Sequence, residues 1–194
     1  MAGTEKYLIY LSKGLKSNGF STTILTRHFP PLLKREIHLD YDLFRVGLNP
    51  FPYTQNKYIG GFSNFIATNF TYSFIGFYEA LKIVKDCNII HAQLGVYADV
   101  HIGAKLSKKL QKPLIITIHG KFGNNVGDII PNKRLLNELR KADLLIVNRD
   151  SAHKFLSENN FKNIVTMYNS IPFNKYKKPK DFKQIDNKIK VLNI

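Results

Sequence analysis

Residues 113–119 read PLIITIH, and the apolar run inside this segment decides the fold. The residues from Leu114 to Ile118 leave no solvent-facing polar side, a pattern typical of a strand buried on both faces of a parallel sheet. Similar short runs lie at 88–92 (NIIHA) and 143–147 (DLLIV), with helical patterns between them. Apolar strands that alternate with helices predict βαβ units and therefore an α/β fold with a doubly wound parallel sheet.

Other elements follow on both sides of this strand. Thr4 is placed to cap a first helix that ends at Asn18-Gly19, and Ser151 is placed to cap a later one. Within the helix at 98–110, the apolar residues at helical spacing are expected to face the core. The predicted helices span 4–16, 98–110, 132–141 and 151–159, and the additional strands span 21–26, 41–46 and 164–167.

Composition limits the class of protein. The chain has 194 residues, of which 44% are hydrophobic and 22% charged, as expected for a soluble globular domain. Cys87 is the single cysteine, which excludes an internal disulfide, favours a reducing compartment and leaves too few ligands for a zinc module. The net charge of +15 predicts attraction to phosphate on nucleic acid, anionic lipid or a small substrate. The alternative is that the many lysines serve only solubility.

An aromatic-rich stretch runs between Lys57 and Lys82 without another basic residue. Its length would span a bilayer, but Asn64 and Asn69 interrupt it, so a core-facing helix is the favoured interpretation and an interfacial membrane helix the second. The expected inward stripe comprises Phe62, Phe65, Ile66, Phe70, Phe74, Phe77 and Leu81.

Both ends of the sequence predict a piece of a larger protein. No strand precedes Gly3, although a doubly wound domain normally opens with one. At the other end, residues 174–190 are polar and Lys-rich and resemble a linker, and residues 191–194 resemble the start of another strand. The expected division is a domain over 1–173 followed by a basic linker and the start of a second domain over 174–194.

The candidate site residues lie where predicted strands end. His119 and Gly120 follow the strand at 113–119, and His91 and Gln93 stand at the end of the neighbouring strand. Ligands of open α/β sheets bind beyond these carboxyl ends, where a neutral imidazole can hydrogen-bond a sugar hydroxyl. His119 is therefore the candidate catalytic residue, and loop carbonyls that merely satisfy its ring are the alternative.

Three further residues are candidates for phosphate binding, and one for a cleft between domains. Gly3 and Thr4 open a helix whose unpaired N–H groups would attract an anion, and Arg149 follows another strand. Asn169 follows the last predicted strand, where a turn or a cleft position is expected. No catalytic triad, phosphate-binding P-loop or metal-binding pair is visible, so no metal is expected.

In order and spacing, these motifs resemble the N-terminal domain of glycosyltransferase family 4, the large GT-B group of retaining glycosyltransferases. Residues 2–5 (AGTE) resemble the family's GG-x-E turn, with Ala2 in place of the first glycine. Residues 88–93 (NIIHAQ) resemble D-I-I-H-A-H, with Gln93 at the last position. Residues 113–120 match P-x-V-x-T-x-H-G, and the segments 13–26, 142–151 and 169–171 resemble further family motifs.

The resemblance implies a Rossmann-like lobe that faces a second such lobe across a cleft. In such enzymes the N-terminal lobe holds the acceptor, and the C-terminal lobe binds a UDP- or GDP-linked sugar without a metal or other cofactor. The glycine turn, Gly3 here, would approach the donor phosphates, and His119 would contact the transferred sugar. The family order places the first strand between those at 21–26 and 88–92, so the sheet is expected to lack that strand.

The resulting hypothesis is the acceptor-binding half of a glycosyltransferase that acts on a glycan or glycolipid and is inactive without a donor domain. The basic surface and the aromatic stretch fit a cytoplasmic protein, peripheral on the anionic inner face of the membrane. A nucleotide-sugar epimerase half is one alternative. The other is a basic nucleic-acid-binding module, which is disfavoured because the basic tail and the aromatic stretch are separate.

Overall fold

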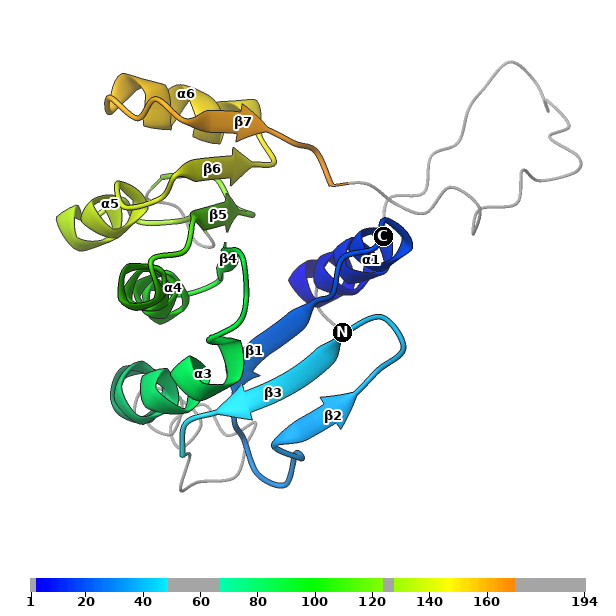
Figure 1. Cartoon of the computed structure of the whole chain (residues 1–194). Helices are drawn as coiled ribbons and strands as arrows, with labels where there is room; N and C mark the ends of the chain where they lie inside the picture. Colours follow the sequence, from blue (N-terminus) through cyan, green and yellow to red (C-terminus); the bar gives the residue numbers. More distant parts are fainter. Residues whose placement is uncertain (1–2, 49–66, 124–127, 170–194) are drawn as a thin grey trace, which may run out of the picture.

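The computed structural model describes residues 3–48, 67–123 and 128–169 (Figure 1). Its helices and strands follow the predicted order, with boundaries shifted by one or two residues for most elements. In chain order they are α1 (Gly3–Ser17), β1 (Thr23–Arg27), β2 (Arg35–Ile37), β3 (Asp42–Val46), η1 (Ala67–Gly76), α3 (Phe77–Val84), β4 (Ile90–Leu94), α4 (Tyr97–Leu110), β5 (Leu114–Ile118), α5 (Lys133–Leu139), β6 (Leu144–Val147), α6 (Asp150–Glu158) and β7 (Ile164–Thr166).

The centre of the fold is a four-stranded parallel sheet in the order β4-β5-β6-β7. The side chains of Leu114, Ile116 and Ile118 on β5 are fully buried, as the apolar run predicts. Each strand follows a helix that returns the chain to the same edge of the sheet. The prediction of βαβ units in a parallel sheet is confirmed.

A second, three-stranded sheet has the order β1-β3-β2. β1 and β3 pair in parallel, whereas the short edge strand β2 pairs antiparallel to β3 and was not predicted, because REI has no alternation of apolar residues. β1 and β4 each end a sheet, so the two sheets are separate. The break falls at the place where the family order predicts the absent first strand.

Helices lie on both sides of the parallel sheet (Figure 1). α4 packs on β4 and β5, and α6 packs on β6 and β7. Gly103 allows the close approach of α4 to the sheet, because a Cβ there would lie 2.8 Å from the Cβ of Ala92. α1 stands apart from α4 and α5, on the other side of the strands (Figure 1).

Helix ends agree with the predictions at one position and differ at two. Gly19 ends α1 with a φ of +84°, and the Phe20 N–H donates to the Leu15 carbonyl at 3.0 Å. Thr4 lies inside α1, which already begins at Gly3, so its expected capping role is wrong. Ser151 is not a cap either, because α6 begins at Asp150 with Arg149 at the N-cap position and no side-chain hydrogen bond there.

The described part of the aromatic stretch, from Ala67 onward, forms helix, and its buried face agrees only in part with the expected stripe. η1 is a π-helix, and it is followed directly by α3. Tyr72 and Phe77 are buried, whereas Phe74 is 64% exposed, so Phe74 does not belong to a core stripe. The wider turn of a π-helix shifts which residues face inward. Phe62, Phe65 and Ile66 lie outside the described residues.

Among the described helices, none combines the length and the apolar character needed to cross a bilayer.

Candidate functional site

Polar side chains gather on one face of the parallel sheet, along β4 and at the end of β5. The prediction that His91 ends its strand is wrong, because β4 continues to Leu94 and His91 is its second residue. Along β4 the burial alternates, with Ile90, Ala92 and Leu94 buried and the two residues between them only partly buried. Ala92 faces α4, as its contact with the helix shows. Because successive strand residues point to opposite faces, His91 and Gln93 lie on the face away from α4.

A chain of hydrogen bonds joins the two predicted histidines. The β4–β5 register pairs Gln93 with Thr117. The Nε2 atom of His91 lies 2.7 Å from the Thr117 hydroxyl and 3.0 Å from the Gln93 side-chain nitrogen. The Gln93 side-chain oxygen lies 2.7 Å from the Nε2 atom of His119. We call these four side chains the imidazole network.

Residues from two other elements hold His119 in place. Tyr7 of α1 meets the His119 ring edge-on, with 4.8 Å between the ring centroids. The side-chain nitrogen of Asn148, which follows β6, donates to the His119 carbonyl at 3.2 Å. The Asn148 side-chain oxygen is buried and has no hydrogen-bond partner, so it remains an available acceptor beside the network.

Burial makes both imidazoles hard to protonate. Burial, followed by the nearby charge of His119, lowers the pKa of His91 to about 4. Burial also lowers the pKa of His119. The pKa of the Tyr7 hydroxyl is raised by burial, against the opposing effect of its hydrogen bond with Thr117. At neutral pH the network therefore consists of neutral groups that donate and accept hydrogen bonds.

The start of α1 lies near this network. Gly3 is the first residue of the helix and Thr4 the second. Tyr7 follows Gly3 by four residues, a rise of about 6 Å along a helix axis. Because the Tyr7 ring contacts His119, the N–H groups at the start of α1 lie within about two turns of the predicted catalytic residue.

Gly120 allows a close approach of Ile129 directly after His119. A Cβ on this residue would lie 3.0 Å from the Ile129 side chain, closer than side chains normally pack. Beyond it, Phe122 and Ile129 form a β-bridge, and the Ile129 N–H donates to the Lys121 carbonyl at 2.9 Å. The described ends of this loop thus pair with each other beside Gly120.

The remaining predicted site residues lie at the same edge but outside the network. Arg149 is exposed, in an extended conformation at the N-cap position of α6. Asn169 is exposed and follows β7. Within the described ranges, neither side chain is hydrogen-bonded to the imidazole network. The structure thus brings His91, Gln93 and His119 together and leaves Arg149 and Asn169 apart from them.

Sequence reasoning missed three residues that contact the predicted histidines. Thr117 is the one polar residue inside the run LIITI, and this signal could have identified it. Asn148 lies within the segment 142–151, and the sequence gives it no separate signal. Tyr7 carries no local signal, because a half-buried aromatic on an amphipathic helix is the usual case.

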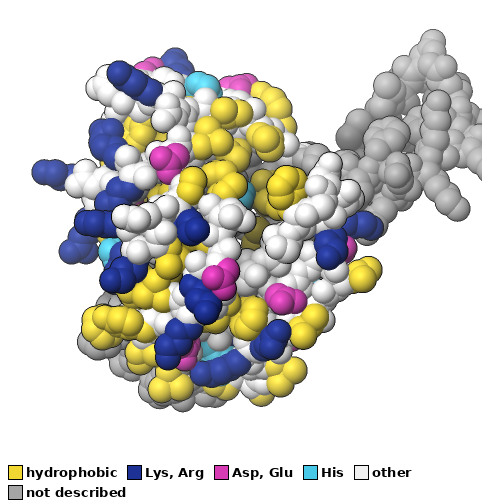
Figure 2. Space-filling view, in the orientation of Figure 1, with side chains coloured by type: hydrophobic (Ala, Val, Ile, Leu, Met, Phe, Trp, Pro, Cys, Tyr) yellow, Lys and Arg dark blue, Asp and Glu magenta, His cyan; other side chains and the backbone are white. Residues whose placement is uncertain are grey.

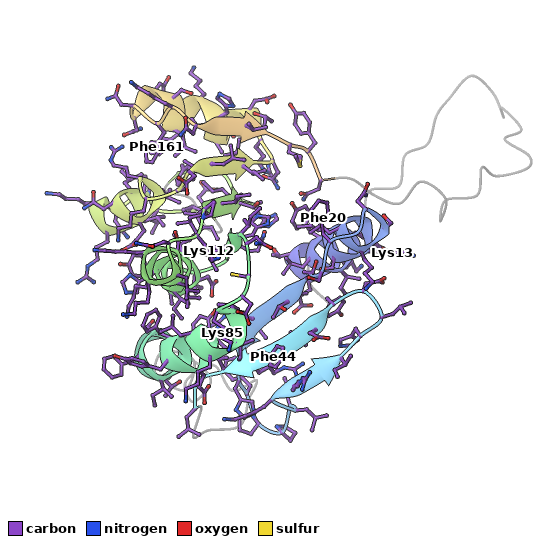
Figure 3. The ribbon with its side chains drawn as sticks, viewed as in Figure 1. Lys13, Phe20, Phe44, Lys85, Lys112 and Phe161 are labelled. Carbon is purple, nitrogen blue, oxygen red and sulfur yellow. The ribbon has the colours of Figure 1, made fainter. Side chains whose placement is uncertain are left out.

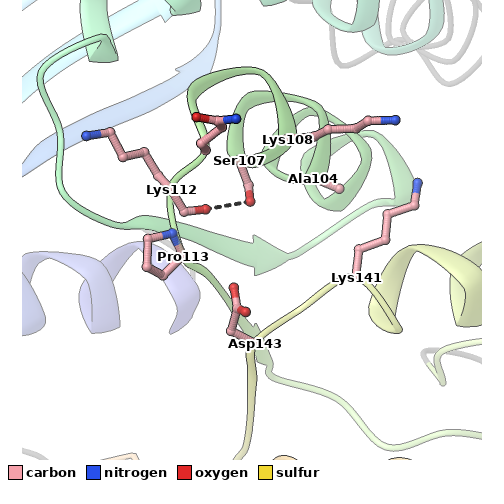
Figure 4. A pocket seen from close by; sticks show the side chains of 8 residues that line it. Ala104, Ser107, Lys108, Lys112, Pro113, Lys141 and Asp143 are labelled. Carbon is pink, nitrogen blue, oxygen red and sulfur yellow. Dashed lines mark hydrogen bonds between the residues drawn. The ribbon is translucent and has the colours of Figure 1, made fainter.

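The hollow drawn in Figure 4 lies at the opposite edge of the sheet. It has a volume of about 590 Å³, and Pro113 and Asp143, which precede β5 and β6, line it. Asp143 accepts a hydrogen bond from the Leu114 N–H at 2.7 Å. No residue of the imidazole network reaches this hollow. Among the described residues, no group of three or more histidine, cysteine or acidic side chains could hold a metal ion.

Comparison with protein families identifies the chain. A family model described as Glycosyltransferase Family 4 matches residues 1–175. Because the match covers most of the 194 residues, the chain belongs to this glycosyltransferase family. No curated protein matches the sequence.

Solved structures share the fold. A sucrose-phosphate synthase from Thermosynechococcus elongatus is 16% identical, with a TM-score of 0.64 over 86% of this chain. A second, shorter sucrose-phosphate synthase chain from the same organism is 15% identical, with a TM-score of 0.54 over 87% of this chain. The match covers 42% of the first structure's own length and 85% of the second's. The chain therefore has the fold of a single GT-B lobe. It spans less than half of the length of the first synthase.

Proposed function

We propose that this family 4 glycosyltransferase lobe is the acceptor side of an enzyme that moves a sugar from a UDP- or GDP-linked donor to a glycan or glycolipid. The donor is the only small molecule that this reaction needs besides the acceptor, and the anomeric configuration is retained. The observation that carries the proposal is the imidazole network, which lies at the carboxyl edge of the sheet beside the start of α1. Ligands of open α/β sheets bind at this edge.

In this proposal His119 contacts a hydroxyl of the transferred sugar. A neutral imidazole suits this role, because sugar transfer passes through a carbon that carries developing positive charge. Burial lowers the pKa of His119, so the ring is uncharged at neutral pH. Gly120 supports the role because, without a side chain, it lets Ile129 pack closely beside the residue that follows His119.

The donor diphosphate would bind at the start of α1. Gly3 and Thr4 contribute unpaired N–H groups at the positive end of the helix dipole. Arg149, exposed at the same edge of the sheet, would add a bidentate donor. His91 and Gln93 would shape the acceptor side through the network, and Asn169 would stand at the cleft with a second lobe.

The donor sugar itself would be held by a second lobe. The chain spans 42% of the length of the first matching sucrose-phosphate synthase, which leaves room in such enzymes for another domain. We therefore expect the 194-residue chain alone to transfer no sugar at a useful rate. Efficient turnover of a nucleotide sugar by this chain would contradict the need for a second lobe.

Donor binding can be tested on the chain by NMR titration. UDP-glucose or GDP-mannose is expected to perturb the amides from Gly3 to Tyr7 and the His119 ring, whereas free glucose should not. The His119→Ala variant should keep the amide changes at α1 and lose part of the affinity. Shift changes confined to the lysines around the hollow at Pro113 and Asp143 would overturn the proposed site.

The proposed location is the cytoplasmic face of an anionic membrane, with η1, α3 and α4 as the contact surface. Phe74, Ile75 and Tyr78 are 64%, 42% and 57% exposed. Lys105 of α4 lies over the Phe77 ring at 4.4 Å, so the basic helix adjoins the aromatic one. Lys and Arg side chains gather over α4 and α5 (Figure 2). Exposed apolar groups bordered by lysines fit a lipid interface.

The proposed membrane-contact surface lies on a different side of the molecule from α1. Lys85 and Lys112 lie on the side that carries α3 and α4, away from Lys13 on α1 (Figure 3). Vesicles that contain phosphatidylglycerol should sediment the chain, and pure phosphatidylcholine vesicles should not. Charge reversal of Lys108 and Lys109 should abolish binding, whereas Lys13→Glu should leave it intact. Equal binding by both variants would remove the proposed surface.

The two alternatives predict different results. The family match favours glycosyl transfer over the epimerase half. A nucleic-acid-binding module would bind unrelated duplex DNA with a steep dependence on salt, because each phosphate contact releases counterions. We expect no such binding beyond the general attraction of a chain with a net charge of +15.

A further inference from the structure

Gln93 lies between the two imidazoles of the network. Its side-chain oxygen faces the Nε2 atom of His119 at 2.7 Å, and its side-chain nitrogen faces the Nε2 atom of His91 at 3.0 Å. These contacts join residues of two adjacent strands, since Gln93 and His91 belong to β4 and His119 follows β5. The amide is thus shared by both rings.

The hydrogen-bonding chemistry of the Gln93 amide determines which ring nitrogen of His119 and of His91 carries the proton. An amide oxygen only accepts hydrogen bonds, so His119 must carry a proton on Nε2 to donate to Gln93. An amide nitrogen only donates, so the Nε2 atom of His91 must hold a lone pair, and the His91 proton resides on Nδ1. The Thr117 hydroxyl, 2.7 Å from the same Nε2 atom, is a second group that can donate to it.

We propose that Gln93 is a positioning residue that holds His119 and His91 in opposite tautomers and keeps the Nδ1 lone pair of His119 available as an acceptor. The inference rests on the proposed function, in which that acceptor receives a hydroxyl of the transferred sugar. Among the described residues, none is hydrogen-bonded to the Nδ1 atom of His119.

A single amide also prevents both rings from donating through Nε2. It offers one oxygen between the two rings, so a second Nε2–H would face the amide N–H groups and repel them. A carboxylate at position 93 would behave differently, because it accepts from both rings and its charge favours an imidazolium. A glutamine at position 93 therefore keeps both imidazoles neutral, with the proton on a different nitrogen in each ring.

The wild-type chain provides the first test, and it requires no variant. Long-range ¹H–¹⁵N spectra of the histidine rings report which nitrogen carries the proton. We expect His119 to be protonated at Nε2 and His91 at Nδ1 at neutral pH. Detection of the same tautomer for both rings in wild type would overturn the proposal, whether or not the chain transfers sugar.

Two variants and a control complete the test. Gln93→Glu should raise the pKa of His119 by about 1–3 units, because a carboxylate would lie at hydrogen-bond distance from the ring. Gln93→Leu should abolish the opposite-tautomer pattern by removing the oxygen that accepts the Nε2 proton of His119. Gln111→Glu adds the same charge at an exposed position outside the network and should change neither property. A folded Gln93→Glu chain with an unchanged His119 pKa would refute the role of Gln93.

Discussion

The edge of the Tyr7 ring meets the His119 ring with 4.8 Å between the centroids and 72° between the ring planes. This contact joins the first helix to the end of the central strand, across 112 residues of sequence. It brings the start of α1 and the imidazole network together in one site. The proposed site for a diphosphate and a sugar uses both parts, because helix N–H groups can bind an anion and a neutral imidazole can hydrogen-bond a hydroxyl.

Two substitutions separate the contributions of the Tyr7 ring and the Tyr7 hydroxyl to stability. Tyr7→Phe should lower the free energy of unfolding by about 1 kcal/mol, since it removes only the hydrogen bond with Thr117. Tyr7→Ala should cost about 2–3 kcal/mol, because the aromatic packing is also lost. Urea unfolding of the three chains checks this order. Equal stability of all three would show that α1 does not anchor to the sheet through this residue.

The buried His91 should make stability depend on pH. Its pKa in the folded chain is lowered to about 4 from an ordinary 6.5, so the unfolded chain binds more protons between these values. Stability is therefore complete above pH 6.5 and falls as the pH drops toward 4, by at most about 1.4 kcal/mol per pH unit for this group.

Urea unfolding across that pH range measures the effect. His91→Asn, which keeps a polar side chain but does not titrate, should flatten the slope relative to wild type. An equally steep slope in His91→Asn would assign the pH dependence to other groups.

Two glycines in helices should respond in opposite ways to alanine. Gly103→Ala should lower the stability by about 1–3 kcal/mol, because its Cβ would lie 2.8 Å from the Cβ of Ala92. Gly14→Ala should raise it by about 0.5–1 kcal/mol, since no atom lies within 4 Å of the added carbon and alanine favours the helix. Thermal unfolding of both variants provides the comparison. A stabilising Gly103→Ala would mean that α4 does not approach β4 as closely as described.

Glu138 on α5 is a buried acidic residue, at 6% exposure. It contacts Lys141 Nζ at 2.7 Å, His101 Nδ1 at 3.1 Å and the Tyr97 hydroxyl at 3.3 Å. Burial would raise its pKa, but the hydrogen bonds from Lys141 and His101 outweigh burial, so the pKa is lowered. Its contribution is therefore present above its unfolded pKa and is lost as the pH falls through the lower folded pKa.

Removal of this charge tests the contribution. Glu138→Gln should destabilise the chain by about 1–3 kcal/mol at neutral pH. Glu158→Gln is the matched control, because Glu158 is 62% exposed and lies 4.0 Å from Lys154, where an ion pair contributes little. Equal effects of the two variants in urea unfolding would show that the contacts of Glu138 are not stabilising.

Local patterns allowed much of the fold to be predicted. The run from Leu114 to Ile118 is too apolar for any place but the middle of a sheet, and helical spacing identified the elements around it. The same patterns placed His119 just after β5 and Gln93 near the end of β4, at the edge where ligand sites of parallel sheets lie. His91, in contrast, is the second residue of β4 and not an end residue. β2 was not predicted, since three residues at a sheet edge leave almost no pattern.

The aromatic segment shows the limit of a local pattern. Regular helical spacing placed Phe74 in the core, but η1 is a π-helix and exposes it. The change of hydrogen-bonding pattern in η1 is not encoded in the spacing of aromatic residues. In the folded chain Tyr72 and Phe77 belong to the buried core, and this long-range packing is not visible in a local pattern.

The amino-acid sequence by itself determined the class of fold, the order of the helices and strands, and the edge of the sheet where the polar residues lie, because these depend on neighbours within a few positions. Only the tertiary structure decided that the strands form two sheets, that Tyr7 reaches His119, and that Gln93 bridges two imidazoles. His119 and Gln93 are 26 residues apart in sequence, and the parallel register of β4 and β5 sets their distance. Such contacts arise from long-range pairing, which no local pattern records.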